Sequence, residues 1–181
     1  MREIAVEPVE AEAFRPFGFV LGTVSQALAP QSLRPAADAV IEMLKPRGPT
    51  GRELHVVELL ERHPFSTQSF IPIGVAAYLV VVASSAADGS PNLTRLRAFR
   101  IPGSTIVQYH AAVWHAPLTA LDPAGSFAMH VHRDGSSGDT EFLDIPPVAI
   151  RLETTGRTST LGRSIPAASR PRDLTLGQEI S

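Results

Sequence analysis

The chain has 181 residues, of which 44% are hydrophobic and 19% are charged, and its formal net charge is -2. This balance is ordinary for one globular domain with a real core, and it gives no electrostatic reason to expect nucleic acid or an anionic membrane as a partner. The chain has no cysteine, which excludes disulfides and thiolate chemistry. The longest apolar run, 75–83, is far shorter than a bilayer requires, and the N-terminus lacks the apolar core of a signal peptide, so we expect a cytoplasmic protein.

Sixteen prolines argue against long helices, and a short helix is expected only at 9–14. An Ala/Pro-rich loop is expected at 25–38. From residue 53 onward the pattern is typical of short strands separated by turn residues. The expected strands are 53–60, 67–73, 76–83, 93–101, 104–109, 112–120, 126–132 and 140–145. Many short strands without intervening helices predict a sandwich or barrel.

We expect residues 1–152 to form this single barrel domain. The tail at 153–181, rich in Thr, Ser, Arg and Pro, is expected to be an extension that packs on the barrel or on a partner subunit. A homodimer is predicted on two grounds. The strand at 93–101 carries Arg95, Arg97 and Arg100 and is expected at a sheet edge or an interface. This strand and the tail after residue 152 both offer edges that need to be covered, which a second subunit would do.

Two histidines share one face of the last but one expected strand. Alternation puts His130 and His132 on one face and Phe127, Met129 and Val131 on the other. Two imidazoles on one strand face could reach into a barrel lumen and bind zinc, nickel, copper or iron. Alternatively, this face meets solvent or a subunit interface, and both histidines are ordinary polar residues there.

A second pair of histidines flanks a possible turn. His110 and His115 are five residues apart, and a turn at Ala111 and Ala112 could bring them together. Trp114, the only tryptophan, is expected to pack in the wall and to orient His115. The alternative is that both histidines are hydrogen-bonded residues at strand ends.

The segment 61–72 places polar groups beside an apolar run. Gln68 has four hydrogen-bonding sites that are costly to bury unpaired, so it either meets a ligand or ties strands together. Glu61 and Arg62 could simply pair with each other. Earlier in the chain, Lys45 and Arg47 follow an apolar run and could anchor a carboxylate, or they could be solvated charges.

The chain lacks the GxGxxG, P-loop, HExxH and GxSxG motifs, which leaves nucleotide-binding, zincin and serine-hydrolase functions without support. The metal-binding HxH motif of cupins, followed by Glu, is not present in that form either. His63 and Gln68 stand roughly in its place.

Several segments of the chain resemble the ureidoglycolate lyase (ureidoglycolate hydrolase) family. They are EAFRPFG at 12–18, ERHP at 61–64, TQSFIP at 67–72, VVVA at 80–83, LRAF at 96–99 and HAAVWHAPL at 110–118. The resemblance implies an all-β, cupin-like (RmlC-like) double-stranded β-helix barrel with a short N-terminal helix, assembled as a homodimer. It also implies cleavage of ureidoglycolate to glyoxylate and urea, an amidine-lyase type of reaction that belongs to allantoin degradation. The chain departs from the family pattern at 31–38, at Ala116 and at His132.

This chemistry needs a base, an acid and a cation for the substrate carboxylate. We expect His110 and His115 to be the base and the acid. Gln68 is expected to orient the substrate, with His63 also at the substrate site, and Lys45 or Arg97 is expected to anchor the carboxylate. A divalent metal (Ni, Zn or Mn) would assist but is not required by the sequence.

Two other functions stay open at this point. One is a metal-dependent cupin enzyme acting on another small carboxylate, with His110, His130 and His132 on one lumen. The other is a barrel that binds a small molecule without catalysis.

Overall fold

The computed structural model describes residues 1–22, 26–122 and 125–152. Within these ranges the chain is almost entirely β-structure, and no helix is long and apolar enough to cross a membrane. The elements are β1 (Arg2–Pro8), α1 (Ala11–Phe14), β2 (Gly18–Leu21), β3 (Asp38–Leu44), β4 (Leu54–Arg62), β5 (Gln68–Ile73), β6 (Ala77–Ala83), a 3-10 turn η1 (Leu93–Arg95), β7 (Arg97–Pro102), β8 (Ile106–Tyr109), β9 (Trp114–His115), β10 (Thr119–Ala120), β11 (Ser126–Arg133) and β12 (Glu141–Arg151). The tail at 153–181 lies outside the described residues, so the expected division of the chain at residue 152 stays a prediction.

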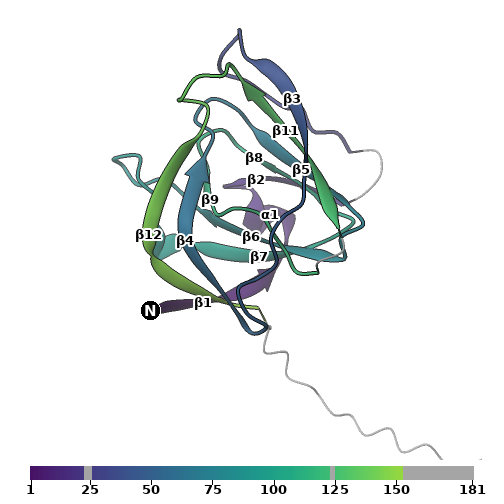
Figure 1. Ribbon diagram of the computed structural model, residues 1–181. Helices are drawn as coiled ribbons and strands as arrows, with labels where there is room; N and C mark the ends of the chain where they lie inside the picture. Colours follow the sequence, from purple (N-terminus) through teal and green to yellow (C-terminus); the bar gives the residue numbers. More distant parts are fainter. Residues whose placement is uncertain (23–25, 123–124, 153–181) are drawn as a thin grey trace, which may run out of the picture.

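The strands form two sheets that face each other across a common interior (Figure 1). One sheet has the order β10-β6-β7-β1-β12-β4-β9, and the other has the order β2-β8-β5-β11-β3. Because β9 also pairs with β6, the larger sheet closes on itself and leaves no free edge at that point. The predicted all-β, cupin-like barrel with a short N-terminal helix is therefore confirmed.

Two strands, β1 and β3, were not predicted from the local sequence pattern and form by pairing with strands that are distant in sequence. The expected helix at 9–14 is only the four residues of α1, and it is preceded by β1, which pairs in parallel with β12 and β7. The expected loop at 25–38 gives way at its end to β3, which pairs with β11. Each of these strands is stabilised by partners that are distant in sequence, so its own residues carry only a weak signal.

The strand expected at 93–101 is corrected in two respects. Residues 93–95 form a 3-10 turn, and β7 begins only at Arg97. This strand pairs with β6 on one side and β1 on the other, so it is an interior strand and not an exposed edge. The expected strand at 112–120 is also broken: it begins only at Trp114, after the positive φ of 64° at Ala112, and residues 116–118, which include Pro117, separate β9 from β10. The strand expected at 140–145 extends to Arg151 as β12.

The core lies on both faces of β6, every residue of which is buried. Val80 and Val82 point into the cluster between the two sheets, whereas Leu79 and Val81 point into a second cluster on the opposite side. Because both faces of β6 are buried, its sequence is a continuous hydrophobic run and not an alternation of apolar and polar residues. This rigid wall supports β9, where Val82 stands opposite His115.

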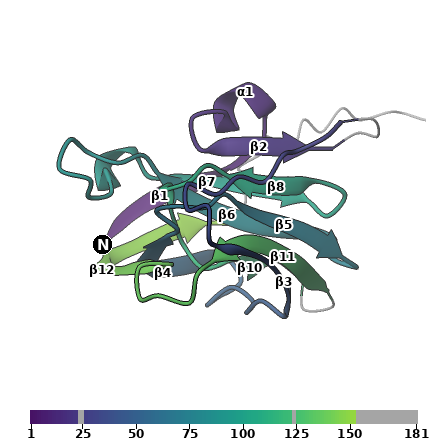
Figure 2. The same cartoon turned by 90° about the horizontal axis from the view of Figure 1, so that it is seen from above.

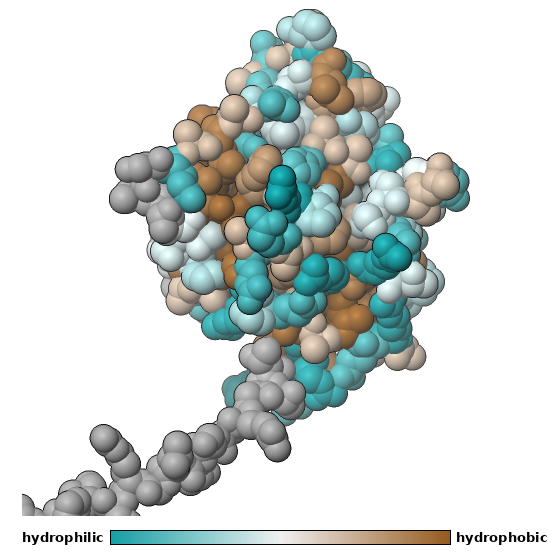
Figure 3. All heavy atoms as spheres, turned by 180° about the vertical axis from the view of Figure 1, so that it is seen from behind, coloured by the Kyte–Doolittle hydropathy of each residue, from teal (hydrophilic) through white to brown (hydrophobic). Residues whose placement is uncertain are grey.

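The helix α1 closes one end of the interior. Phe14 is completely buried and packs edge-on against Phe99 and beside Tyr109. Figure 2 shows α1 and β2 lying across the back of the molecule. From behind, the surface shows several hydrophobic patches between hydrophilic residues (Figure 3).

Candidate active site and metal centre

Three side chains converge at the inner end of β4 and β9. Glu61 lies near the end of β4, His63 follows directly, and His115 belongs to β9, where it stands opposite Glu61 in the sheet. One ligand atom from each residue lies within 4.8 Å of the other two. Both histidines are buried, with 4% of His63 and 2% of His115 exposed, so the cluster is shielded from bulk water.

Backbone carbonyls orient both imidazole rings. The Nδ1 atom of His115 lies 2.9 Å from the carbonyl oxygen of Val113, and Nδ1 of His63 lies 3.1 Å from that of Asp139. A carbonyl can only accept a hydrogen bond, so each Nδ1 carries the proton in the neutral ring. Each Nε2 therefore has a lone pair that faces the cluster.

Neither Nε2 atom has a hydrogen-bond partner among the residues that the structure describes. Nε2 of His115 lies 3.3 Å from Oε1 of Glu61, which is a close contact but lacks hydrogen-bond geometry. The ring of His115 stacks on Tyr109 with 4.3 Å between centroids. A buried nitrogen without a partner is costly, which makes this pair the strongest structural sign of a functional site.

Burial and neighbouring charges lower the pKa values of both Glu61 and His63. Burial alone would raise the pKa of Glu61, but the close contact with His115 and the charges of His115, His63 and Arg133 outweigh it and lower that pKa. Burial, and then the neighbouring His115, lower the pKa of His63 from 6.5 to about 4. Near neutral pH the cluster thus has an ionised carboxylate and a neutral His63 with a free lone pair.

This donor set suits a divalent metal ion. Two neutral imidazole nitrogens and one carboxylate oxygen are ligands that transition metals accept, and a site with three protein ligands leaves room for substrate. Hydrogen bonds from Nδ1 to fixed acceptors are also the usual way in which metal-binding histidines are oriented. The two unpartnered Nε2 atoms are the observation that shows the fit.

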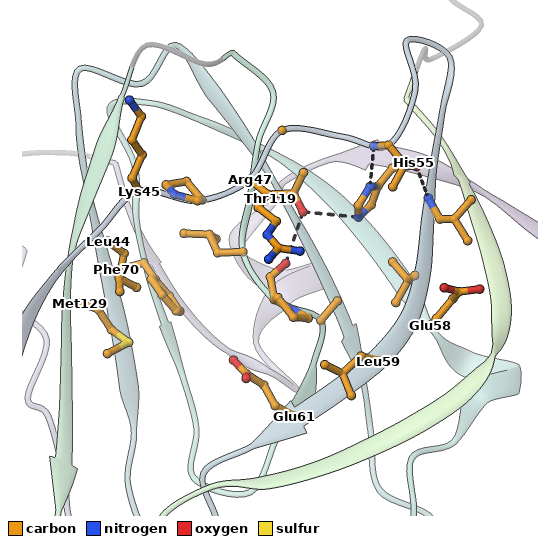
Figure 4. Close-up of a pocket in the computed structure, with 18 of the residues that line it drawn as sticks. Leu44, Lys45, Arg47, His55, Glu58, Leu59, Glu61, Phe70, Thr119 and Met129 are labelled. Carbon is orange, nitrogen blue, oxygen red and sulfur yellow. Dashed lines mark hydrogen bonds between the residues drawn. The ribbon is translucent and has the colours of Figure 1, made fainter.

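A cavity of about 520 Å³ opens beside the cluster, with Glu61 in its wall (Figure 4). Gln68 also lines it; its Nε2 donates to Sδ of Met129 at 3.1 Å, while its Oε1 is buried without a partner among the described residues. Other lining residues are Lys45, Arg47, His55, Phe70, Leu118 and Thr119.

Comparison with known proteins identifies the family. The sequence profile of the Ureidoglycolate lyase family matches residues 22–150. The chain belongs to the ureidoglycolate lyase family. A protein of Agrobacterium fabrum, named for the same activity, is 35% identical over 159 residues, covering 84% of this chain and 97% of that protein. The ureidoglycolate lyase of Brucella melitensis biotype 2 is 34% identical over 167 residues, covering 84% and 95%, and that of Stutzerimonas stutzeri is 31% identical over 157 residues, covering 78% and 89%.

Among solved structures, the oxalate decarboxylase of Lactobacillus farciminis in complex with formate gives a TM-score of 0.37 at 16% identity. The match covers 77% of this chain and 33% of that one. The Bacillus subtilis oxalate decarboxylase gives 0.35 at 14% identity, covering 77% and 30%. Similarity at this level carries no argument about the site.

The structure does not bring His110 and His115 together. His110 follows β8 on the outer side of the sheet, where its Nε2 lies 3.2 Å from the carbonyl oxygen of Arg15 and its ring meets Phe19 edge-on. His115 faces the interior. The turn at Ala112 sends the chain from one side of the wall to the other instead of folding the two histidines toward each other.

The expected positions of His130 and His132 in the lumen are corrected in the same way. Their alternation is as expected, but Phe127, Met129 and Val131 take the interior face and are buried in the core. His130 and His132 therefore lie on the outer face of the five-stranded sheet, with ring centroids 4.9 Å apart. Alternation alone could not tell which face of the strand is inside.

The remaining expected site residues divide into two groups. His63 and Gln68 lie at the cluster and the cavity, and Lys45 lines the cavity. Arg97 does not line it, because its guanidinium pairs with Glu7 at 2.6 Å and lies over the ring of Phe99.

Two residues of the site were not anticipated. A simple pair of Glu61 with Arg62 was one interpretation of the sequence, but Arg62 pairs with Glu141 and Glu61 belongs to the cluster. The i, i+2 spacing of Glu61 and His63 at a strand end was the available signal. Arg133 is the second, since its charge acts on Glu61 and His63 while its side chain pairs with Glu42 at 2.6 Å. Nothing local in the sequence distinguishes it from other arginines.

We predict that His63 makes the protein less stable in acid. Its pKa is about 4 in the folded protein and near 6.5 when unfolded, so the unfolded chain binds more protons between these values. Its contribution is fully present above pH 6.5 and is lost as the pH falls toward 4. His63→Gln should flatten the decline in unfolding free energy over this range by on the order of 1–3 kcal/mol, measured by urea denaturation with a chelator present. His110→Gln should keep the wild-type pH dependence, and identical curves for wild type and His63→Gln would contradict the prediction.

Proposed function

We propose that this protein is a ureidoglycolate lyase, a carbon–nitrogen lyase of the amidine-lyase type that releases glyoxylate and urea. The single observation that carries the proposal is the convergence of Glu61, His63 and His115, with two unpaired Nε2 atoms, beside a cavity in a member of this family. Such an activity would belong to allantoin degradation in purine metabolism.

The reaction moves one proton and changes no oxidation state overall. The hydroxyl group on the central carbon loses its proton as the carbon–oxygen double bond forms. The bond from that carbon to the ureido nitrogen breaks, and the nitrogen takes up a proton to leave as urea. A single group that accepts the first proton and returns it to the nitrogen is therefore sufficient.

Glu61 is the group that fits this role. Its lowered pKa keeps the carboxylate ionised and ready to accept the hydroxyl proton, and it lines the cavity directly. His115 directs its Nε2 at the same carboxylate, at 3.3 Å from Oε1 of Glu61, because its Nδ1 is hydrogen-bonded to the carbonyl oxygen of Val113. Gln68 offers its unpaired Oε1 to an N–H group of the ureido end, which orients the departing nitrogen.

The cofactor we propose is a divalent ion such as nickel, zinc or manganese, held by Glu61, His63 and His115. When bound, it would act as a Lewis acid that polarises the substrate hydroxyl. The protein supplies the neutral nitrogens through the two Nδ1–carbonyl hydrogen bonds, and burial excludes competing water. The imidazoles of His63 and His115 would each use their one free nitrogen as a ligand, whereas the carboxylate of Glu61 has a second oxygen besides the one that would hold the ion, so proton transfer falls to Glu61.

We predict that His115→Asn lowers turnover by about a hundredfold or more, because asparagine cannot place an Nε2 lone pair at the cluster. Urea and glyoxylate release from racemic ureidoglycolate is the measurement, with thermal unfolding as a check that the variant folds. His110→Asn is the matched control and should retain most activity, since His110 lies outside the interior. No urea from the wild type, with or without added divalent metal, would contradict the proposed function.

Elemental analysis provides a separate test of the metal centre. Protein produced with nickel, zinc or manganese should retain about one ion per chain, as a site with three protein ligands holds a single ion. Glu61→Gln and His63→Ala should lose it, whereas His130→Ala and His132→Ala on the outer face should keep it. Retention of the ion by both cluster variants would contradict this assignment.

We also propose that the protein is a homodimer, on different grounds from those given by the sequence. The expected edge at β7 is an interior strand, and the tail lies outside the described residues. An apolar patch instead covers the outer face of β3, β11 and β5. Register places Ala128 between Met43 and Ile71, with Ile41 and Ile73 in adjacent rows.

The side chains of this patch are strongly exposed for their type, with 73% of Ile41 and 64% of Met43 accessible. A flat apolar sheet face of this kind is unfavourable in water and is suited to pack on its own copy about a twofold axis.

We predict a dimer by light scattering at micromolar concentration for the wild type. The double variant Ile41→Asp and Met43→Asp should be a monomer, because two carboxylates would be buried unpaired at the interface. Phe142→Asp, at an equally exposed apolar position on β12 in the other sheet, should remain a dimer. A monomeric wild type, or a dimeric double variant, would show that this face is not the interface.

A further inference from the structure

The segment 45–50 forms one rim of the cavity and is fixed from two sides. The carbonyl oxygen of Arg47 accepts a hydrogen bond from the backbone N–H of Ala120 at 3.1 Å. The backbone N–H of Thr50 donates to Nδ1 of His55 at 3.3 Å, and Oγ1 of Thr50 accepts from the N–H of Val56 at 2.9 Å. The rim therefore holds a defined backbone position over the cavity.

The two cations of this rim point in different directions. In Figure 4 the guanidinium of Arg47 extends into the cavity, toward the side where Glu61 lies, while the ammonium of Lys45 points away from it. The guanidinium of Arg47 has no hydrogen bond or ion pair with any residue that the structure describes. By contrast, Arg133, the cation near the cluster, is already paired with Glu42.

We propose that Arg47 binds the substrate carboxylate and so selects ureido acids over neutral ureido compounds, a role that rests on the proposed lyase function. A guanidinium presents donors in a planar fork that matches the two oxygens of a carboxylate. The carboxylate end of the substrate then lies at the rim and the ureido end lies beside Gln68. This takes the place of the anchoring role expected for Lys45 or Arg97.

The contact holds the substrate and takes no part in the proton transfer, so its loss should raise KM more than it lowers kcat. Arg47→Gln should raise KM for ureidoglycolate by about tenfold or more, the scale of a hydrogen bond to a charged group, with kcat within about threefold of wild type. Arg47→Lys should recover part of the loss. Arg52→Gln is the matched control, an exposed arginine close by on the same connection that lines a different cavity, and it should keep wild-type KM.

A second measurement separates substrate recognition from a purely structural effect. The wild type should prefer ureidoglycolate to its uncharged methyl ester, and Arg47→Gln should lose most of that preference. An unchanged KM, or an unchanged preference, in Arg47→Gln would overturn the inference while leaving the lyase function intact.

If the wild type instead releases no urea, the proposed function fails and Arg47 is tested by binding alone. Glyoxylate, a simple carboxylate, is then titrated into the wild type and Arg47→Gln by calorimetry. Weaker binding to the variant supports Arg47 as the carboxylate site. Equal binding, or no binding to either protein, overturns it.

Discussion

The pairing of the two-residue strand β9 with both β4 and β6 is the constraint on which the site depends. It closes the larger sheet and sets His115 opposite Glu61 on one side and Val82 on the other. Further backbone bonds fix the same segment, since the N–H of Ala112 donates to the carbonyl oxygen of His63 and that of Ala116 donates to Val81. One short segment, paired with two longer strands, thus holds His115 and Glu61 in register.

The site combines polar atoms with an unusually apolar setting. Tyr109 stacks on His115, and the wall behind it is the fully buried strand β6. In such surroundings an unpaired acceptor is expensive, and yet Nε2 of His63, Nε2 of His115 and Oε1 of Gln68 all lack partners among the described residues. Burying these unpaired atoms lowers the free energy of unfolding, and a metal ion or substrate that binds them raises it again. The stability of the fold is therefore linked to the occupancy of the site.

Strand alternation separates the proposed catalytic site from the proposed dimer interface. On β11 the residues at odd positions line the core between the sheets, while His130 and its neighbours face outward beside Ile41 and Ile71. Changes on the outer face can therefore alter association without touching the interior, and the converse also holds. The rim at 45–50 belongs to neither face, because it lies on a connection between β3 and β4 at the edge of the cavity.

The sequence by itself determined the all-β class, most strands after residue 53, the family, and the choice of His63, Gln68 and His115 as candidate site residues, because hydrophobic period and ordered motifs are local properties. It could not decide that His110 lies outside, that His130 and His132 face away from the lumen, or that Glu61 rather than Arg62 joins the cluster. Alternation says which residues share a face of a strand, but only pairing and register with distant strands decide which face is buried. The same holds for Arg47 and Lys45, two cations separated by one residue, whose side chains point into and away from the cavity only in the tertiary structure.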